Sequence, residues 1–310
     1  MGIAFGDNAD IKAEPEERQV RNINPYLVDG PDVFVEKRSK PLADLPRVTK
    51  GSQPTDGGAL LVEPEDYEAI MADPIAAQYV RPFVGAKELI HGLPRWCLWI
   101  SDSEVDKARK SPVVAERLAQ VTQFRSASKK AGTRALAAIP HQFGERRQPT
   151  HGYVCIPRHF SETRDFATVK WFNEGDISGD ANFTADDPDG FLFAIISSLM
   201  FMTWQRLVGG RLKSDLRFSN TLVWNTFPLP TPSVEERTSI VKAGQHIVHV
   251  RSALSDGSLA NIYSKTPLDD ELRDAHFALD AAVDRLFNLD MSSIDQRERA
   301  LIKSYLKLSQ

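Results

Sequence analysis

The sequence predicts an α+β fold, in which a mixed domain is followed by a small α-helical domain. Up to about residue 232, short apolar runs alternate with segments rich in glycine, proline and aspartate, a pattern typical of short strands and helices. Beyond that point, amphipathic stretches with serine-led capping patterns take over. We therefore expect a lead-in over residues 1–21, an α+β domain over 22–232 and a helical domain over 233–310.

The composition is ordinary for a globular protein of one or two domains, with 310 residues that are 42% hydrophobic and 26% charged. The first residues lack the basic and apolar stretches of a signal peptide. The longest apolar run, 191–208, contains Ser, Thr, Gln and Arg, so a buried helix is expected there rather than a membrane span. Cys97 and Cys155 stand in apolar, strand-like contexts, which predicts buried free thiols in the reducing cytoplasm.

The elements expected before residue 111 are short. Glycine, proline and aspartate mark a loop at 51–58. Pro64 opens a helix, and the acidic residues that follow it suit the positive end of the helix dipole. The expected elements are, in order, a strand at 33–36, a strand at 60–62, a helix at 64–72, a loop with a strand or short helix at 81–90, a strand at 95–100 and a short helix at 103–110.

A long helix is expected from Pro112 to about residue 138. Ser111 is a favoured cap, and proline is favoured at the first helical position. Apolar residues recur at steps of three and four and continue as alanines, which predicts one packed face. The opposite face is predicted to carry Arg117, Arg125, Ser128, Lys129 and Arg134.

Beyond residue 150, strands and then helices are expected. Proline ends the strand predicted at 221–230. Ser233 with Glu236, and Ser293 with Gln296, form capping-box patterns that begin helices. The expected elements are strands at 152–159, 166–172 and 221–230, a core helix in 191–208, and helices at about 233–254, 268–288 and 293–308.

Basic residues are unevenly distributed, although the net charge is −4. Between residues 125 and 147 six basic residues oppose only Glu145, and between 206 and 217 four oppose only Asp215. Such local excess on an otherwise acidic chain is typical of a face that contacts nucleic acid. Solvated helix faces remain the alternative.

Recognisable catalytic motifs are missing from the sequence. Asn24-Pro-Tyr26 lacks the second proline of the loop with which adenine methyltransferases hold a flipped base, so we interpret it as a structural turn. The glycine pairs lack the strand–turn–helix context of a phosphate or dinucleotide site, and no zinc spacing, GxSxG or HExxH occurs. We therefore predict that this chain is not an enzyme by itself and that it holds no cofactor or metal.

Seven ordered segments together resemble one family. They are Asn22-Ile-Asn-Pro-Tyr-Leu-Val-Asp-Gly30, Arg38-Ser-Lys-Pro-Leu42, Gly51-Ser-Gln-Pro-Thr-Asp-Gly-Gly58, Arg95-Trp-Cys-Leu-Trp99, Phe124-Arg-Ser-Ala-Ser-Lys-Lys130, Gly209-Gly-Arg-Leu-Lys-Ser-Asp215 and Asn225-Thr-Phe-Pro-Leu-Pro230. The chain resembles the C-terminal target-recognition region, with its helical tail, of the MmeI-like type IIL restriction–modification enzymes, which fuse a DNA adenine methyltransferase with an endonuclease. Residues 1–21 would then lead in from an upstream methyltransferase region.

The resemblance implies a function and partners. The chain would recognise a specific sequence in double-stranded DNA through the major groove, for an N6-adenine methyltransferase that in some parents also cuts. S-adenosylmethionine and Mg²⁺ would be bound only in the parent enzyme, whose methyltransferase and nuclease domains would be the other partners. The alternatives are a protein-interaction scaffold without base readout and, less simply, an enzyme with an unrecognised site.

The resemblance also implies which residues read bases. Glu162 and Arg164 match a Glu-x-Arg pair that reads one base pair in the family. In an extended segment these residues would point to the same face. Glutamate accepts from cytosine N4 and arginine donates to guanine, so a C·G pair is expected. A surface salt bridge is the alternative.

Two further groups are predicted to contact DNA. On the helix near 124–134, Ser128 and Thr133 are expected at base edges, or else on a merely exposed face. The expected phosphate contacts are Lys129, Lys130, Arg134, Arg158, Lys213, Ser214, Arg217 and Ser219. For the four from Lys213 onward, a structural turn is the alternative.

Overall fold

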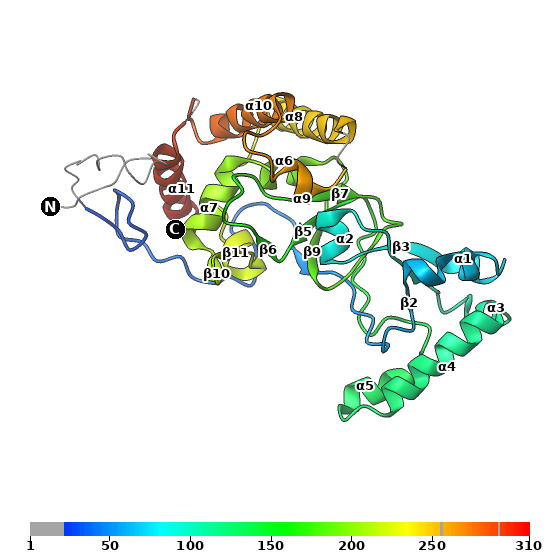
Figure 1. Cartoon of the computed structure of the whole chain (residues 1–310). Coiled ribbons are helices and arrows are strands. Elements are labelled where there is room, and N and C mark those ends of the chain that lie inside the picture. The colour runs from blue at the N-terminus through cyan, green and yellow to red at the C-terminus, as the bar shows by residue number, and fades with distance from the viewer. Residues whose placement is uncertain (1–21, 255–256, 291) are drawn as a thin grey trace.

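The structure, a computed structural model, describes residues 22–254, 257–290 and 292–310 (Figure 1). The expected lead-in at 1–21 lies outside the described residues. Two hydrophobic clusters divide the described chain. One forms a large lobe, and the other forms a small lobe from residues 54–83 and 95–146 with a strand at 177–178. The fold is α+β, as the sequence predicts.

A four-stranded antiparallel sheet lies in the large lobe. Its order is β1 (Thr49–Lys50), β9 (Asn182–Asp186), β5 (Tyr153–Pro157) and β7 (Lys170–Phe172). Every residue of β5 is buried, as expected for the apolar central strand of a sheet covered on both faces. Two buried helices follow β9, namely α6 (Phe191–Ile196) and α7 (Leu199–Val208).

The C-terminal helices complete the large lobe. They are α8 (Val234–Ala253), α9 (Leu259–Ile262), α10 (Asp270–Leu286) and α11 (Ile294–Ser309). Helix α8 lies between α6 and α10, and α11 packs on α7 (Figure 1). Gly244 allows α8 to approach α6, because a Cβ there would lie 2.6 Å from that of Ala194. The helices after residue 232 therefore share one core with the sheet.

The small lobe has its own sheet, in the order β2 (Leu61–Val62), β4 (Trp96–Leu98), β3 (Val80–Val84) and β8 (Ile177–Ser178). Around this sheet lie α1 (Pro64–Met71), η1 (Ala76–Tyr79), α3 (Val105–Ala108), α4 (Pro112–Ser126), α5 (Ala131–Ala135) and η2 (Leu136–Ala138), while α2 (Ala86–His91) packs toward the large lobe. Strand β8 pairs in parallel with β3 and links the two lobes. Gly51 and Gly179 are required at this link, since a Cβ on Gly51 would meet the Gly179 carbonyl oxygen at 2.3 Å.

A third sheet lies at the edge of the large lobe. It consists of β10 (Gly210–Leu212), β11 (Asp215–Arg217) and β6 (His159–Phe160), all antiparallel. The five-residue π-helix η3 (Asn220–Trp224) follows, with Ser219 as its cap. Neither the β10–β11 hairpin nor α9 is among the elements expected from the sequence.

Four expected elements differ from the structure. The helix expected at 112–138 ends at Ser126, and α5 begins only after a loop. The core helix is divided at Ser197–Ser198, where the Ser198 hydroxyl caps α7. The strand expected at 221–230 is the π-helix η3 followed by extended chain. Residues 33–36 alternate between buried and exposed side chains as a strand would, but no partner strand pairs with them in the described chain.

Other predictions are confirmed. The helices expected near 64–72, 233–254, 268–288 and 293–308 are present, the second and fourth with complete capping boxes. Cys97 and Cys155 are buried free thiols, and burial raises the pKa of Cys155 to about 12. Among the described helices, none is both long and apolar enough to cross a membrane.

Candidate nucleic-acid interface

The predicted reader residues lie in a turn beside the third sheet. We call β6, β10 and β11, together with the turn Ser161–Arg164, the hairpin surface. Backbone pairing joins Arg217 to His159 and Leu216 to Phe160, and the Phe218 amide donates to the Arg158 carbonyl. Two segments nearly sixty residues apart in the sequence are thereby fixed side by side.

Glu162 and Arg164 do not lie in an extended segment, as the sequence analysis expected. The Arg164 amide donates to the Ser161 carbonyl over 3.3 Å, which closes a turn. Alternation of side chains between two faces therefore does not apply to this pair. Glu162 forms an ion pair, but its partner is Arg211 on β10, with Nη1 and Oε2 3.3 Å apart. Both side chains remain about half exposed.

Arg164 is more enclosed than Glu162. Burial lowers the pKa of its guanidinium, and the charge of Asp215 acts in the opposite direction. Arg206, on α7, donates from Nη2 to the Arg164 carbonyl over 3.0 Å. The same guanidinium lies 3.7 Å from Asp165. Arg206 therefore holds the backbone of the turn that carries Glu162 and Arg164 against α7.

The hairpin surface is basic. Lys213 lies at the hairpin tip with φ +56°, a left-handed conformation that costs free energy for a non-glycine residue. Arg211 donates to the Ser214 carbonyl, which braces the tip. The Ser219 hydroxyl accepts a hydrogen bond from the Leu222 amide as the cap of η3, so it already has a partner. The side chains available for phosphate are Arg158, Lys213, Ser214 and Arg217.

The second predicted group lies on a separate arm, formed by α4 and α5 (residues 112–135). The Ser128 hydroxyl accepts from the Lys130 amide, and Arg134 Nη1 donates to the Ser128 and Lys129 carbonyls over 2.9 Å. Lys129, Lys130 and Arg134 are exposed, and Thr133 is half-buried on α5. The structure thus places these five residues together, on a different lobe from the hairpin surface.

Arg125 differs from its expected place on the exposed face of the helix. It is 0% exposed and donates to five backbone carbonyls, those of Pro54, Thr55, Leu136, Ile139 and Gln142. Arg117 likewise binds the Ala59 and Leu61 carbonyls. These arginines fix α4 to the loop at 54–61. Arg125 is one of the six basic residues between 125 and 147, and it is not available to bind DNA. Fewer positive charges are therefore exposed here than the sequence suggests.

A third group of polar residues, which the sequence analysis did not single out, lies where the lobes join. We call it the inter-lobe hollow; it is lined by Thr49, Lys50, Gln53, Glu145, Arg147, Asp180, Phe183 and Asn220. Gln53 and Glu145 form a backbone bridge at the base of the small lobe, while Asn220 opens η3 directly after the hairpin surface. The hollow is therefore lined by residues from both lobes.

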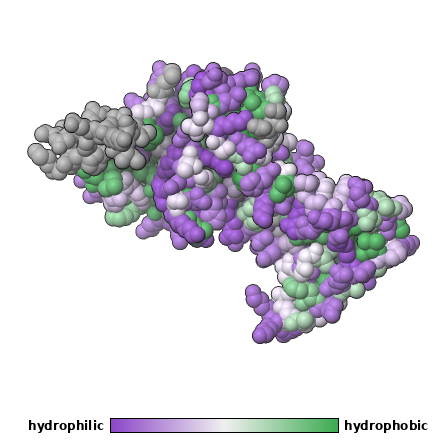
Figure 2. Space-filling model, in the orientation of Figure 1, coloured by the Kyte–Doolittle hydropathy of each residue, from purple (hydrophilic) through white to green (hydrophobic). Residues whose placement is uncertain are grey.

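The segments that carry these three groups extend from the large lobe to the arm. The hairpin β10–β11 and helix α5 both occupy the lower side of Figure 1, with the sheet and the inter-lobe segments between them. Figure 2 shows a concave outline between the arm and the large lobe, with mostly hydrophilic residues on the visible face. In the described part of the chain, no group of three or more His, Cys, Asp or Glu side chains could hold a metal ion.

The chain is similar to known proteins over nearly its whole length. Residues 29–231 match the family model of the MmeI target recognition domain, and residues 233–310 match that of the MmeI C-terminal domain. DNA methyltransferase A of Bacillus subtilis (strain 168) is 32% identical over 305 residues, which are 98% of this chain and 35% of that protein.

A solved structure is also similar. It is that of the type IIL restriction–modification enzyme MmeI in complex with DNA, with 35% sequence identity and a TM-score of 0.84 over 96% of this chain. The match covers 40% of the MmeI chain, so this chain spans well under half the length of either relative. The chain belongs to the MmeI target recognition domain family, and its last part is the C-terminal domain that follows in the same enzymes.

Proposed function

We propose that this chain is the sequence-recognition module of a DNA N6-adenine methyltransferase and that it binds double-stranded DNA along its concave side. The main support for this proposal is the turn at Ser161–Arg164. The Ser161–Arg164 turn presents a carboxylate and a guanidinium, Glu162 and Arg164, at the rim of a surface that is otherwise basic. The structural similarity to an enzyme solved with DNA supports the proposal.

Glu162 and Arg164 are proposed to read one C·G base pair in the major groove. A carboxylate accepts from the amino group of cytosine, and a guanidinium donates to O6 and N7 of guanine. The turn is compatible with this role, because both residues follow β6 directly and Arg206 braces the backbone. Arg211 would orient the Glu162 carboxylate while its second oxygen remains available to a base.

The remaining predicted contacts are proposed to position the duplex. Arg158, Lys213, Ser214 and Arg217 would bind phosphates on the hairpin side, with Ser219 placing the start of η3. On the arm, Lys129, Lys130 and Arg134 would bind phosphates, and Ser128 and Thr133 would approach base edges. Phosphate contacts fix orientation and register, whereas base contacts supply specificity.

Catalysis is proposed to reside outside this chain. The methyltransferase motifs are missing from the sequence, and the two relatives are much longer than the matched region. The parent would bind S-adenosylmethionine and, if it also cuts, Mg²⁺, and would act in the cytoplasm. We take residues 22–232 as the recognition domain and 233–310 as the helical domain, although the two share a core.

The test is selection of bound duplexes from a random pool at moderate salt, followed by sequencing. We expect an enriched asymmetric motif of several base pairs, including a C·G pair whose enrichment disappears when Glu162 and Arg164 are both replaced by alanine. Salt-sensitive binding without enrichment would contradict sequence reading by this chain alone. No binding at any salt concentration would contradict the proposal and favour a protein-interaction module.

A further inference from the structure

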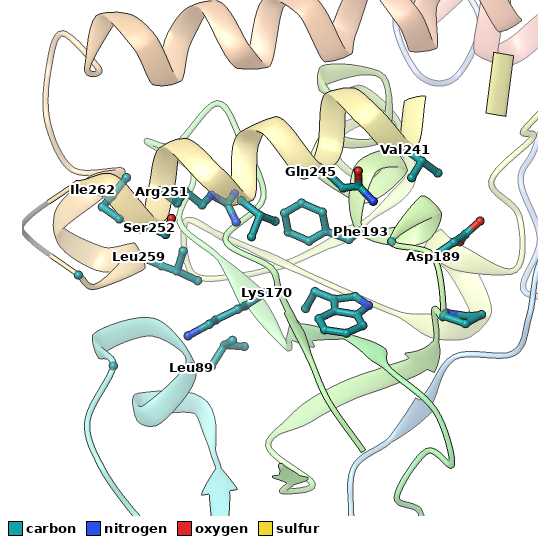
Figure 3. Close-up of a pocket in the computed structure, with 16 residues that line it drawn as sticks. Leu89, Lys170, Asp189, Phe193, Val241, Gln245, Arg251, Ser252, Leu259 and Ile262 are labelled. Carbon is teal, nitrogen blue, oxygen red and sulfur yellow. The ribbon is translucent and has the colours of Figure 1, made fainter. Parts of the chain in front are cut away.

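A cavity of about 590 Å³ lies in the large lobe, and none of its lining residues belongs to the hairpin surface (Figure 3). It is enclosed by α8 on one side and by β7, α2 and α9 on the others. Its walls are mainly apolar and include Leu89, Trp171, Phe193, Val241, Leu259 and Ile262. This volume lies in the range of cavities that take small organic molecules, roughly 300–1,000 Å³.

The charged groups of the cavity are mostly cationic. Lys170 and Arg251 line it together with one carboxylate, Asp189. Asp189 is already neutralised, because both its oxygens accept from Arg237 over 2.8 to 3.1 Å. Within the described chain Lys170 forms no ion pair, and its ammonium lies 5.1 Å from the centre of the Phe172 ring. An occupant with a negative charge would therefore complement the cavity.

Arg251 is fixed in position by groups behind the cavity. Its Nε donates to the Tyr263 hydroxyl over 2.7 Å, and its Nη1 donates to the Val169 carbonyl over 2.8 Å. The Tyr263 hydroxyl lies 2.7 Å from His276 Nε2. Burial lowers the pKa of His276 well below its ordinary value, so the neutral ring accepts this bond and the tyrosine oxygen is left to accept from Arg251. These bonds hold the guanidinium in one orientation at the wall of the cavity.

One donor of this guanidinium lacks a partner. Arg251 Nη2 is buried and makes no hydrogen bond within the described chain. The guanidinium carbon lies 5.3 Å from the centre of the Phe193 ring, which forms the adjoining wall. Buried donors are rarely left unsatisfied, and those that are require an explanation. Because Nη2 is closed off from water, an acceptor in the cavity would reach it only after a small movement of the neighbouring side chains.

The opposite wall is a flat aromatic surface. The Trp171 indole is held in place because its Nε1 donates to the Asp187 carbonyl over 2.7 Å. Trp171 comes from β7 and Phe193 from α6, and both line the cavity. A planar apolar body between them would bury its faces on these rings. An anion without such a body would leave the aromatic walls in contact with water.

We propose that this cavity binds a small organic anion, one that carries a carboxylate or sulfonate on a flat aromatic body. The anionic group would lie between Arg251 and Lys170, and the ring system would lie between Trp171 and Phe193. The site is independent of DNA recognition, since none of these residues belongs to the hairpin surface, the arm or the inter-lobe hollow. A bound anion would join α8 to β7 and stabilise the fold.

The probe is 2-naphthoate, compared with its neutral amide, 2-naphthamide, on the DNA-free chain. Calorimetric titration should show one site for 2-naphthoate and binding of 2-naphthamide that is at least about tenfold weaker, because the amide lacks the charge-assisted bonds. The melting temperature should rise with 2-naphthoate only. Equal affinities for the two probes, or no binding of either at millimolar concentration, would overturn the proposal.

Substitutions at residues that line the cavity test whether 2-naphthoate binds there. Lys170→Gln should weaken 2-naphthoate several-fold, and Val248→Trp should block the cavity from the exposed side of α8. Lys242→Gln is the matched control, since Lys242 is exposed on α8 but does not line the cavity. Arg251→Gln is not needed, because loss of its structural bonds could unfold the lobe. Binding that survives both Lys170→Gln and Val248→Trp would place the anion elsewhere and refute the proposal.

Discussion

Arg211 Nη1 lies 3.3 Å from Glu162 Oε2, although the two residues are 49 positions apart in the sequence. An ion pair this exposed contributes only about 0–1 kcal/mol to stability. Its consequence is geometric, because the β10–β11 hairpin fixes the direction of a carboxylate that would otherwise rotate freely at the tip of a turn. The hairpin therefore positions the proposed base-reading pair and also carries proposed phosphate contacts.

Arg211→Gln should reduce discrimination at the base pair that Glu162 reads, by roughly three- to tenfold, because the carboxylate loses its orientation. The free energy of unfolding should change by less than about 1 kcal/mol. Competition binding with duplexes that differ at that one base pair measures the ratio. Lys303→Gln, a change at an exposed position on α11, is the control and should leave the ratio unchanged. An equal loss on every duplex would show that Arg211 contacts phosphate instead.

Exchanging the two reader chemistries should exchange the preferred base pair. In Glu162→Lys with Arg164→Asp, a donor replaces the acceptor and an acceptor replaces the donor, so the preference should change from C·G to G·C. Selection from a pool randomised at that position gives the answer directly. The double variant places a lysine beside Arg211, so reduced affinity is expected alongside the new preference. An unchanged preference would refute the assignment of this pair.

Lys213→Asn should weaken binding to every duplex by about the same factor. Asparagine tolerates the left-handed backbone that Lys213 adopts, so the hairpin should keep its shape while one phosphate contact is lost. The slope of log affinity against log salt should become shallower by about 0.9. Binding of specific and unrelated duplexes across a salt series measures both effects. If the loss is confined to the specific duplex, the residue reads sequence.

The helical tail illustrates what the sequence can predict. Ser233 with Glu236, and Ser293 with Gln296, are local patterns, and both capping boxes form as predicted. The sequence pattern does not predict the breaks inside longer apolar stretches, even where the residues that cause them can be identified. Ser198 caps α7 in the middle of an apolar run, because its hydroxyl offers the next turn a better start than continuation would.

The candidate site illustrates what the sequence cannot predict. The residue types of Glu162 and Arg164 are apparent from the sequence, but their turn depends on Arg206 and their electrostatics on Arg211, both distant along the chain. The predicted position of Arg125 is wrong for the same reason. Its helical position suggested an exposed face, whereas five carbonyls from residues 54–55 and 136–142 surround it. Such long-range partners leave no periodic signal in the sequence.

Arg125→Met should destabilise the small lobe strongly. Five buried carbonyls would lose a charged donor at once, so a loss of roughly 3 kcal/mol or more in the free energy of unfolding is expected. Urea unfolding measures this loss. Arg134→Met is the matched control on the arm, because it is exposed and should cost about 0.5 kcal/mol or less while still weakening DNA binding. Similar stabilities for the two variants would contradict a structural role for Arg125.

Asp280 should make the stability of the chain depend on pH. Burial raises its pKa from the ordinary 3.8 to about 7, although the Leu199 amide donates to one oxygen and Arg297 is nearby. The folded chain therefore holds a proton here more tightly than the unfolded chain does. This contribution is complete below about pH 4 and is lost as the pH rises through about 7.

Asp280→Asn keeps an acceptor for the Leu199 amide but cannot ionise. The variant should match the unchanged chain near pH 4 and exceed its free energy of unfolding by roughly 2–4 kcal/mol at pH 8. Urea unfolding at intervals from pH 4 to 8 measures the difference. A shallower decline should persist in the variant, because burial also raises the pKa of Asp187, to about 6. Asp274→Asn, exposed on the same helix, should leave the profile unchanged, and parallel profiles for Asp280→Asn and the unchanged chain would contradict a buried, protonated Asp280.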